Sequence, residues 1–347
     1  MRQTELLISL KNLKNNLQII KSKTTSDIQA VIKANAYGLG YEEVVECIEN
    51  DVESFAVITL NEAISLRKHT NKPITLLQGV HEISDYDYIQ KYNLDFVVHS
   101  HWQLENLSKF HLNQSRIWFK LNTGMNRLGF DQNDFGDVYE KLKPLKAKDL
   151  IIMSHLAASS EPENKLNNAQ IKLFNEITSG TTNKKSLANS GAIFNFPNAH
   201  FDIVRSGIAI YGGKYLENGL KPVSKLRSKI ISIRKVKKGD CIGYDGAWTA
   251  DKDCRVCYAP IGYADGIPYF SSCRKINIDG KQFFTVGKVN MDLIAVNLEN
   301  DNSIKEGDWV EFWGFEHDLT KFSKNFDTIS YQLMTNLSGR VEKNYLK

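Results

Sequence analysis

Residues 29–50 read QAVIKANAYGLGYEEVVECIEN. The apolar, β-branched run at 29–33 is typical of a buried strand, and a glycine-containing loop follows it. Residues 41–50 then place Val44, Val45 and Ile48 on one face of a helix. This stretch therefore predicts one strand–loop–helix unit.

The same alternation recurs as far as about residue 212. Nearly continuous apolar strands with helices between them indicate a parallel sheet that is buried on both faces. Eight strands in about 200 residues favour a closed (β/α)₈ barrel of the TIM type, with an open doubly wound sheet as the alternative. The predicted strands are 29–33, 54–60, 74–78, 94–100, 117–121, 150–155, 186–189 and 202–211, and helical patterns lie at 41–50, 61–69, 103–110 and 169–178.

Turn sequences become frequent after residue 220. Asp279-Gly280 lies between two apolar runs and is typical of a two-residue hairpin turn. We therefore expect an α/β barrel domain at residues 1–220 and a mostly β domain at 221–347, with a helix at 329–337.

Composition excludes several classes of protein. The 347 residues are 42% hydrophobic and 24% charged, and 44 basic against 40 acidic residues leave a net charge of +4. Such a composition is typical of a globular protein and gives little reason to expect a nucleic-acid partner. No apolar run has the roughly 18 residues that a membrane span needs, and the first residues do not resemble a signal peptide.

The cysteines indicate a reducing compartment, which is the cytoplasm. There are five of them, an odd and sparse set, at Cys47, Cys241, Cys254, Cys257 and Cys273. The Cys254-x-x-Cys257 spacing lacks the second ligand pair of a zinc site, so we expect no metal.

Lys33 is the most informative residue at the predicted barrel mouth, where the strands of such barrels end and their active sites lie. A lysine that follows Ala-Val-Ile is partly desolvated, which lowers the pKa of its amine and makes the amine nucleophilic. Schiff-base chemistry with an aldehyde such as pyridoxal 5'-phosphate needs such an amine. The simpler interpretation is a lysine that extends from a strand end toward water.

Two further groups suit that cofactor. Ser190, Gly207 and Ile208 lie near the seventh and eighth strands, where barrel loops often bind phosphate. Arg205 interrupts an apolar run, and a guanidinium that faces the pyridine nitrogen would leave that nitrogen unprotonated. The alternatives are ordinary loop residues and an Arg205–Asp202 ion pair.

Together these residues resemble the alanine racemase family over nearly the whole chain. The resemblance rests on seven segments in the family's order, at 30–38, 120–130, 188–190, 205–208, 261–266, 287–292 and 331–336. It implies L-alanine/D-alanine interconversion that supplies D-alanine for peptidoglycan. It also implies pyridoxal 5'-phosphate, and a homodimer in which each barrel site is completed by the partner's β domain.

The resemblance also implies a role for each site residue. Lys33 would hold the cofactor and act as one base, and Tyr263 would be the second base. His155 would connect Tyr263 with Arg205, the partner of the pyridine nitrogen. The remaining roles are substrate binding by Arg127 and Met291, and phosphate binding by Tyr37, Ser190, Gly207, Ile208 and Tyr331.

Three positions depart from the family's pattern, and a fourth matches a lysine that many relatives modify. Ser186 stands where the family commonly has histidine, Ser160 where it often has an acid, and Lys288 where it has an arginine. Lys120 matches a lysine that many relatives carry in carbamylated form. A broader-specificity racemase acting on serine or other amino acids, and a non-catalytic pyridoxal-phosphate carrier, are the alternative functions.

Overall fold

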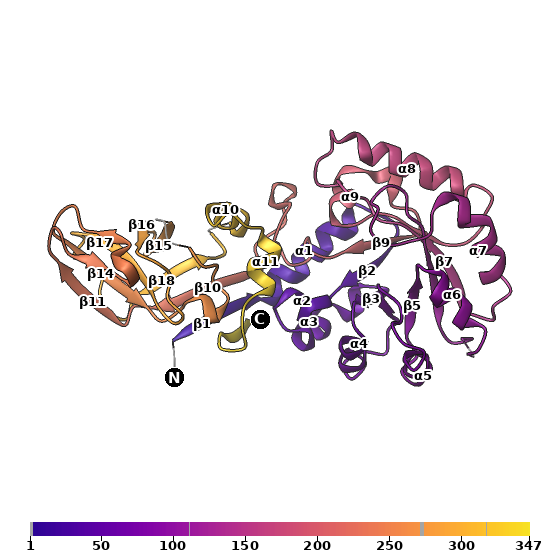
Figure 1. Ribbon diagram of the computed structural model, residues 1–347, viewed down its shortest axis with the longest axis horizontal. Helices are drawn as coiled ribbons and strands as arrows, with labels where there is room; N and C mark the ends of the chain where they lie inside the picture. Colours follow the sequence, from indigo (N-terminus) through magenta and orange to yellow (C-terminus); the bar gives the residue numbers. More distant parts are fainter. Residues whose placement is uncertain (1–2, 111, 271–273, 317) are drawn as a thin grey trace. The chain divides into compact units, whose positions relative to one another are not determined.

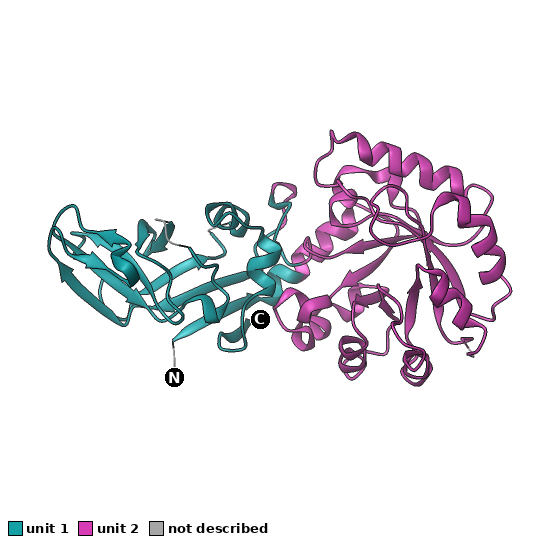
Figure 2. Cartoon of the chain, in the orientation of Figure 1, with its two compact units in different colours: residues 1–13, 211–216, 221–347 teal, residues 14–210, 217–220 magenta. Residues whose placement is uncertain are grey.

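The computed structural model describes residues 3–110, 112–270, 274–316 and 318–347, so Cys273 lies outside the described residues. The chain divides into two compact units (Figure 2). The barrel unit comprises Lys14–Ile210 and Glu217–Leu220, and the β unit comprises Met1–Leu13, Tyr211–Leu216 and Lys221–Lys347. None of the described helices combines the length and the apolar character that a membrane crossing needs.

The barrel unit contains eight parallel strands in the order β8-β7-β6-β5-β4-β3-β2-β9. Figure 1 labels β2, β3, β5, β7 and β9 among them. A parallel bridge between Asn189 and Arg205 joins the two ends of this order. The predicted α/β barrel is therefore confirmed, and the open doubly wound sheet is not observed. The strands are β2 (Asp27–Val31), β3 (Ser54–Val57), β4 (Ile74–Leu76), β5 (Asp95–Val98), β6 (Arg116–Lys120), β7 (Asp149–Met153), β8 (Lys185–Ser186) and β9 (Ile203–Ser206).

Helices follow these strands around the barrel. The predicted helical patterns are confirmed as α3 (Tyr41–Ile48), α4 (Leu60–Leu66), α6 (His101–Leu107) and α8 (Lys165–Thr178). The sequence analysis missed α1 (Leu10–Ser22), α5 (Asp85–Lys91), α7 (Phe135–Leu142) and the short helix α9 (Ser190–Asn195).

The barrel core explains the near-continuous apolar strands. Strands β3, β5, β6 and β9 are buried along their whole length. Part of the core is a cluster of side chains from different strands, namely Val97, Trp118, Ile151, Met153 and Ile203. A strand that is covered on both faces must be apolar at successive positions, which is why its sequence does not alternate.

Several predicted strands run past the strand ends that the structure gives, and two of these ends bear on the candidate site. Strand β2 ends at Val31, so Lys33 lies in the following turn and not in the strand. Strand β9 ends at Ser206, and a turn begins at Gly207. Apolar residues in both turns are buried, so hydrophobicity alone could not reveal where extended backbone stopped.

The β unit is built on a nine-stranded sheet in the order β11-β14-β17-β16-β15-β18-β10-β1-β19. Strand β1 (Thr4–Ser9) pairs antiparallel with β10 (Ser224–Lys229) and parallel with β19 (Glu342–Leu346). The expected barrel domain began at residue 1, whereas the structure groups the first strand with the C-terminal part of the chain. The other strands are β11 (Ser232–Val236), β14 (Cys254–Ala259), β15 (Lys275–Ile278), β16 (Lys281–Val286), β17 (Ile294–Glu299) and β18 (Trp309–Trp313).

Smaller elements complete this unit. Asp279 and Gly280 have φ of 49° and 72° and join β15 to β16, as the predicted hairpin turn requires. The helix expected at 329–337 is observed as α11 (Ser330–Thr335). It follows α10 (Leu319–Asn325), and a separate two-stranded sheet pairs β12 (Cys241–Ile242) with β13 (Trp248–Thr249).

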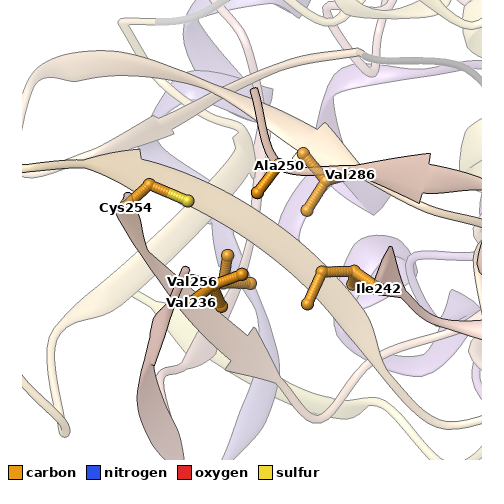
Figure 3. Close-up of a cluster of buried hydrophobic side chains, with 6 residues drawn as sticks. All are labelled: Val236, Ile242, Ala250, Cys254, Val256 and Val286. Carbon is orange, nitrogen blue, oxygen red and sulfur yellow. The ribbon is translucent and has the colours of Figure 1, made fainter. Parts of the chain in front are cut away.

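The Cys254-x-x-Cys257 motif belongs to the interior of the β unit. Both cysteines are buried in β14 and, three residues apart, point to opposite faces of the strand. Cys254 packs in a cluster with Val236, Ile242, Ala250, Val256 and Val286 (Figure 3). The residues that the structure describes contain no group of three or more side chains arranged to hold a metal ion.

Candidate active site

The candidate residues of the barrel unit follow the C-terminal ends of its strands, where barrel active sites lie. Lys33 comes after β2, Arg127 after β6, His155 after β7, Ser190 after β8, and Gly207 after β9. The strands therefore bring residues that are distant in the sequence to one end of the barrel.

A left-handed turn follows Lys33. Ala34, Asn35, Ala36 and Tyr37 have φ between 52° and 55°, a conformation that costs an L-residue roughly 1–2 kcal/mol. The Ala34 N–H donates to Oε1 of Glu62 at 2.7 Å, and the Gly38 N–H donates to the Ala34 carbonyl at 2.8 Å. Backbone strain of this kind persists where the surroundings hold it, commonly at functional sites.

The surroundings of Lys33 favour a neutral amine. Burial lowers the pKa of Lys33, the positive charge of Arg127 lowers it further, and the negative charge of Glu62 opposes them. Burial, together with the charges of Arg205, Arg127 and Lys33, also lowers the pKa of Lys120 to about 8. This concentration of positive charge suits an anionic ligand.

Arg205 is a buried cation, with 4% of its surface exposed. Its Nη1 donates to the Ser186 hydroxyl at 2.5 Å, and its Nη2 donates to the Ser154 carbonyl at 2.6 Å. Nη2 also lies 3.3 Å from Nδ1 of His155. Burial lowers the pKa of Arg205 to about 10, so it stays charged at neutral pH.

The alternative partner for Arg205, Asp202, is otherwise engaged. Its Oδ2 accepts a hydrogen bond from the Lys185 N–H at 2.8 Å, and the residue is exposed. The guanidinium is therefore held mainly by neutral acceptors, and its charge remains available to a ligand.

Gly207 lets the Tyr37 hydroxyl approach the backbone closely. A Cβ at position 207 would lie 2.5 Å from the Tyr37 hydroxyl oxygen, which is closer than real Cβ contacts. The Gly207 N–H donates to Oγ of Ser190 at 2.9 Å, and Ile208 is buried beside it. A hydrogen bond thus joins two of the candidate phosphate-binding residues, Ser190 and Gly207, and Tyr37 lies against Gly207.

These features together fit pyridoxal 5'-phosphate. Lys33 supplies a nucleophilic amine, Arg205 a buried cation, and Gly207 a backbone that the Tyr37 hydroxyl approaches more closely than any side chain would allow. Each of these groups suits one part of the cofactor. Lys33 suits the aldehyde, Arg205 the pyridine nitrogen, and the Gly207 loop the phosphate.

The remaining candidates lie in the β unit. Tyr263 is 43% exposed and begins a 3₁₀ turn, η6 (Tyr263–Asp265). Its N–H donates to the Asn290 carbonyl, and the Ala264 N–H donates to the Met291 carbonyl, both at 3.1 Å. The structure therefore brings the predicted tyrosine and the predicted Met291 segment side by side.

Tyr331 lies in α11 of the same unit. Burial raises the pKa of its hydroxyl to about 12. The chain after α11 contacts the Tyr263 turn, because the Ser338 N–H donates to the Asp265 carbonyl at 3.1 Å.

Sequence reasoning missed Glu62 and the side-chain role of Asn189. Glu62 belongs to a capping box with Thr59 at the start of α4, so the Thr-x-x-Glu pattern could have identified it as a helix cap. That pattern contains no sign of the contact with Ala34. Asn189 caps α9 and also approaches His155.

The chain matches two family models. The alanine racemase N-terminal domain covers residues 8–215, and the alanine racemase C-terminal domain covers residues 223–345. The alanine racemase of Haemophilus influenzae is 36% identical, over 98% of this chain and 97% of that protein. That of Mannheimia succiniciproducens is 35% identical over the full length of both.

Solved structures agree with these matches. The biosynthetic alanine racemase from Pseudomonas aeruginosa superposes with a TM-score of 0.96 at 32% identity, over 100% of both chains. The alanine racemase from Bartonella henselae with covalently bound pyridoxal phosphate gives a TM-score of 0.91 at 28% identity, also over 100% of both chains. On full-length similarity in both sequence and structure, the chain belongs to the alanine racemase family.

Proposed function

We propose that this chain interconverts L-alanine and D-alanine with pyridoxal 5'-phosphate as its cofactor. The observation that carries the proposal is Lys33, a lysine of lowered pKa beside a strained turn and within a group of cations. The relative from Bartonella henselae holds the same cofactor covalently, which supports the choice.

Each part of the cofactor has a proposed partner. The Lys33 amine would hold its aldehyde carbon, and Arg205 would face its ring nitrogen. The phosphate would lie among Tyr37, Ser190, Gly207, Ile208 and Tyr331. When bound, pyridoxal phosphate supplies an electron sink that makes the α-C–H of an attached amino acid acidic.

The protein then needs two bases, one for each face of the α-carbon. Nζ of Lys33 would accept or return the proton on one face, and Oη of Tyr263 would do so on the other. Burial favours the neutral, proton-accepting form of Lys33. Because each base serves one face, inversion requires no rotation of the substrate.

The substrate carboxylate would bind to Arg127 and to the backbone at Met291. Arg127 is exposed to solvent and lies close enough to Lys33 to lower its pKa. A guanidinium can bind a carboxylate through two parallel hydrogen bonds, which would fix the orientation of the α-carbon.

The wider setting follows from the same family membership. We propose a homodimer in the cytoplasm in which Tyr263 of the partner subunit completes each site. The barrel domain would bind the cofactor, and the C-terminal β domain would contribute the second base. D-alanine for peptidoglycan would be the product that the cell uses.

The test is incubation of the purified holoenzyme with L-alanine in D₂O, with chiral chromatography and mass spectrometry of the product. D-alanine that carries α-deuterium is the expected result. Holoenzyme that gives neither D-alanine nor α-deuterium would contradict the proposal, and faster turnover of L-serine would reassign the main substrate.

The Tyr263→Phe variant tests the second base. It should keep the cofactor absorbance and lose most of its racemisation, because only the phenolic oxygen is removed. Unchanged turnover would show that Tyr263 is not a base. The exposed Tyr244 is a matched control, and Tyr244→Phe should retain activity.

A further inference from the structure

The imidazole of His155 lies between two hydrogen-bond donors. Its Nδ1 is 3.3 Å from Nη2 of Arg205, and its Nε2 is 3.2 Å from Nδ2 of Asn189. A guanidinium only donates hydrogen bonds, so the Arg205 side offers the ring no acceptor.

The orientation of the Asn189 side chain is set by two other contacts. Its Oδ1 accepts the Ala192 N–H at 3.2 Å, as the cap of α9, and also accepts the Ser159 hydroxyl. Because both of these groups donate, the amide oxygen must face them and the amide nitrogen must face His155. The same nitrogen donates to the Leu156 carbonyl at 3.2 Å, which agrees with this orientation.

The number of protons on the His155 ring determines which hydrogen bonds it can form with Arg205 and Asn189. A neutral imidazole has one N–H and one lone pair, and an imidazolium has two N–H groups and no lone pair. The neutral ring of His155 can accept from one of its two neighbours, whereas the charged ring would point an N–H at a donor on each side. We propose that Asn189 is a positioning residue that, together with Arg205, keeps His155 neutral over the working pH range of the protein.

The charged groups around the ring act in the same direction. Burial lowers the pKa of His155 well below its ordinary value. The charges of Arg205 from β9, of Lys120 and Arg127 in and after β6, and of Lys33 after β2 lower it further. All four of these groups are basic, and none of them favours a charged imidazole.

A neutral His155 changes the interpretation of the site. Of the three residues Asn189, His155 and Arg205, only Arg205 then carries a charge. The role of His155 is to hold the Arg205 guanidinium in place. A proton that Tyr263 exchanges with substrate would then not be stored on His155. This consequence rests on the proposed function, whereas the neutral state of the ring does not.

The experiment measures the ring directly. The holoenzyme is labelled with ¹⁵N-histidine, and the ring nitrogens of His155 are followed by NMR from about pH 5 to 8, where an ordinary histidine changes charge. Loss of signals in His155→Gln assigns them. One protonated and one bare ring nitrogen, unchanged across this range, is the expected result.

Two variants isolate the contribution of Asn189. Asn189→Asp keeps an equally good capping oxygen but replaces the donor with an acceptor, so His155 should carry two ring protons at neutral pH. Asn189→Ser keeps a capping oxygen and removes the amide nitrogen. Its His155 titration midpoint should lie above that of the native chain and below that of the Asp variant.

Two outcomes would overturn the proposal. One is a native His155 that is charged at neutral pH, and the other is a titration midpoint that is the same in the native chain and its folded variants. If Asn189→Asp does not fold, the His155 titration midpoints of Asn189→Ser and of the native chain are compared instead, and equal midpoints would overturn the proposal. Absence of racemisation with a neutral His155 would count against the proposed function and would leave this inference intact.

Discussion

Glu62 holds the turn next to Lys33 through the backbone of Ala34. One carboxylate oxygen accepts the Ala34 N–H at 2.7 Å, while the other accepts the N–H groups of Ile58 and Thr59 at 3.0 and 3.1 Å. A single side chain therefore joins the loop after β2 to the start of α4. Its negative charge also raises the pKa of Lys33, against the effect of burial.

Glu62→Gln should weaken both functions of this carboxylate. The amide nitrogen of glutamine would face backbone N–H groups on one side, and the free energy of unfolding should fall by about 1–3 kcal/mol. Without the negative charge, the pKa of Lys33 should fall further, because a nearby anion stabilises the protonated amine. The acid limb of the pH–rate profile should therefore shift to lower pH. Chemical denaturation and pH–rate measurements test the two effects, and an acid limb that shifts to higher pH would contradict the assignment.

Gly207→Ala should weaken cofactor binding. The added methyl would lie 2.5 Å from the Tyr37 hydroxyl oxygen, so the tyrosine must move away from the proposed phosphate site. We expect the Kd for pyridoxal phosphate to rise at least tenfold, measured by equilibrium titration of the apoprotein. Gly136→Ala is the control. Position 136 lies in α7, and a Cβ added there would have no heavy atom within 4 Å apart from its chain neighbours and the backbone of its own helix, so that change should leave the Kd unchanged.

Ser186→Ala should destabilise the Arg205 site. The serine hydroxyl donates to the Ile203 carbonyl at 2.7 Å and accepts from Nη1 of Arg205 at 2.5 Å. Removing it leaves a buried guanidinium N–H without that acceptor, which costs about 1–3 kcal/mol. Ser206→Ala is the matched control, because the Ser206 hydroxyl is also buried but has no hydrogen-bond partner among the described residues. Equal losses of stability in the two variants, measured by thermal denaturation, would contradict this explanation.

Asp265→Ala should loosen the turn that carries Tyr263. The buried carboxylate accepts the Gly262 N–H at 2.8 Å and lies 3.6 Å from Nε of Arg340. Loss of the buried acceptor of the Gly262 N–H should cost about 1–3 kcal/mol. It should also lower kcat more than it changes KM.

The neighbouring Asp292 provides the comparison for Asp265. It also pairs with Arg340, at 2.5 Å, but is largely exposed. Asp292→Ala should therefore cost no more than about 1 kcal/mol. A larger loss from Asp292→Ala than from Asp265→Ala would show that the exposed pair, and not the buried acceptor, holds the turn.

The sequence predicted elements that depend on local patterns. The barrel strands follow from apolar runs, and the β15–β16 hairpin follows from Asp279-Gly280, whose residues readily adopt positive φ. The turn at 34–37 was not predictable in this way, because alanine and tyrosine disfavour the left-handed region. Contacts with the rest of the barrel, such as that with Glu62, hold it there.

The candidate site residues also divide into those that local sequence reveals and those that only contacts in the folded chain reveal. Lys33, Arg205 and Gly207 stand out because a charge or a glycine interrupts an apolar context. Asn189 does not stand out, and Ser186 does so only by comparison with the family, since the importance of both comes from neighbours in other strands and loops. Local sequence therefore identifies unusual residues more readily than the ordinary polar residues that orient them.

The pairing of β1 with β10 and β19 has a consequence for how the protein is made. Thr4–Ser9 leaves the ribosome well before its partner strands, which begin at Ser224 and Glu342. At roughly 5–20 residues per second, the strand waits on the order of ten seconds or more for its first partner. Throughout that time its ladder N–H and C=O groups are open to other strands, including those of neighbouring nascent chains. Chaperone capture of this nascent strand, or slower synthesis of its partner strands, would therefore change the yield of this protein without changing its final fold.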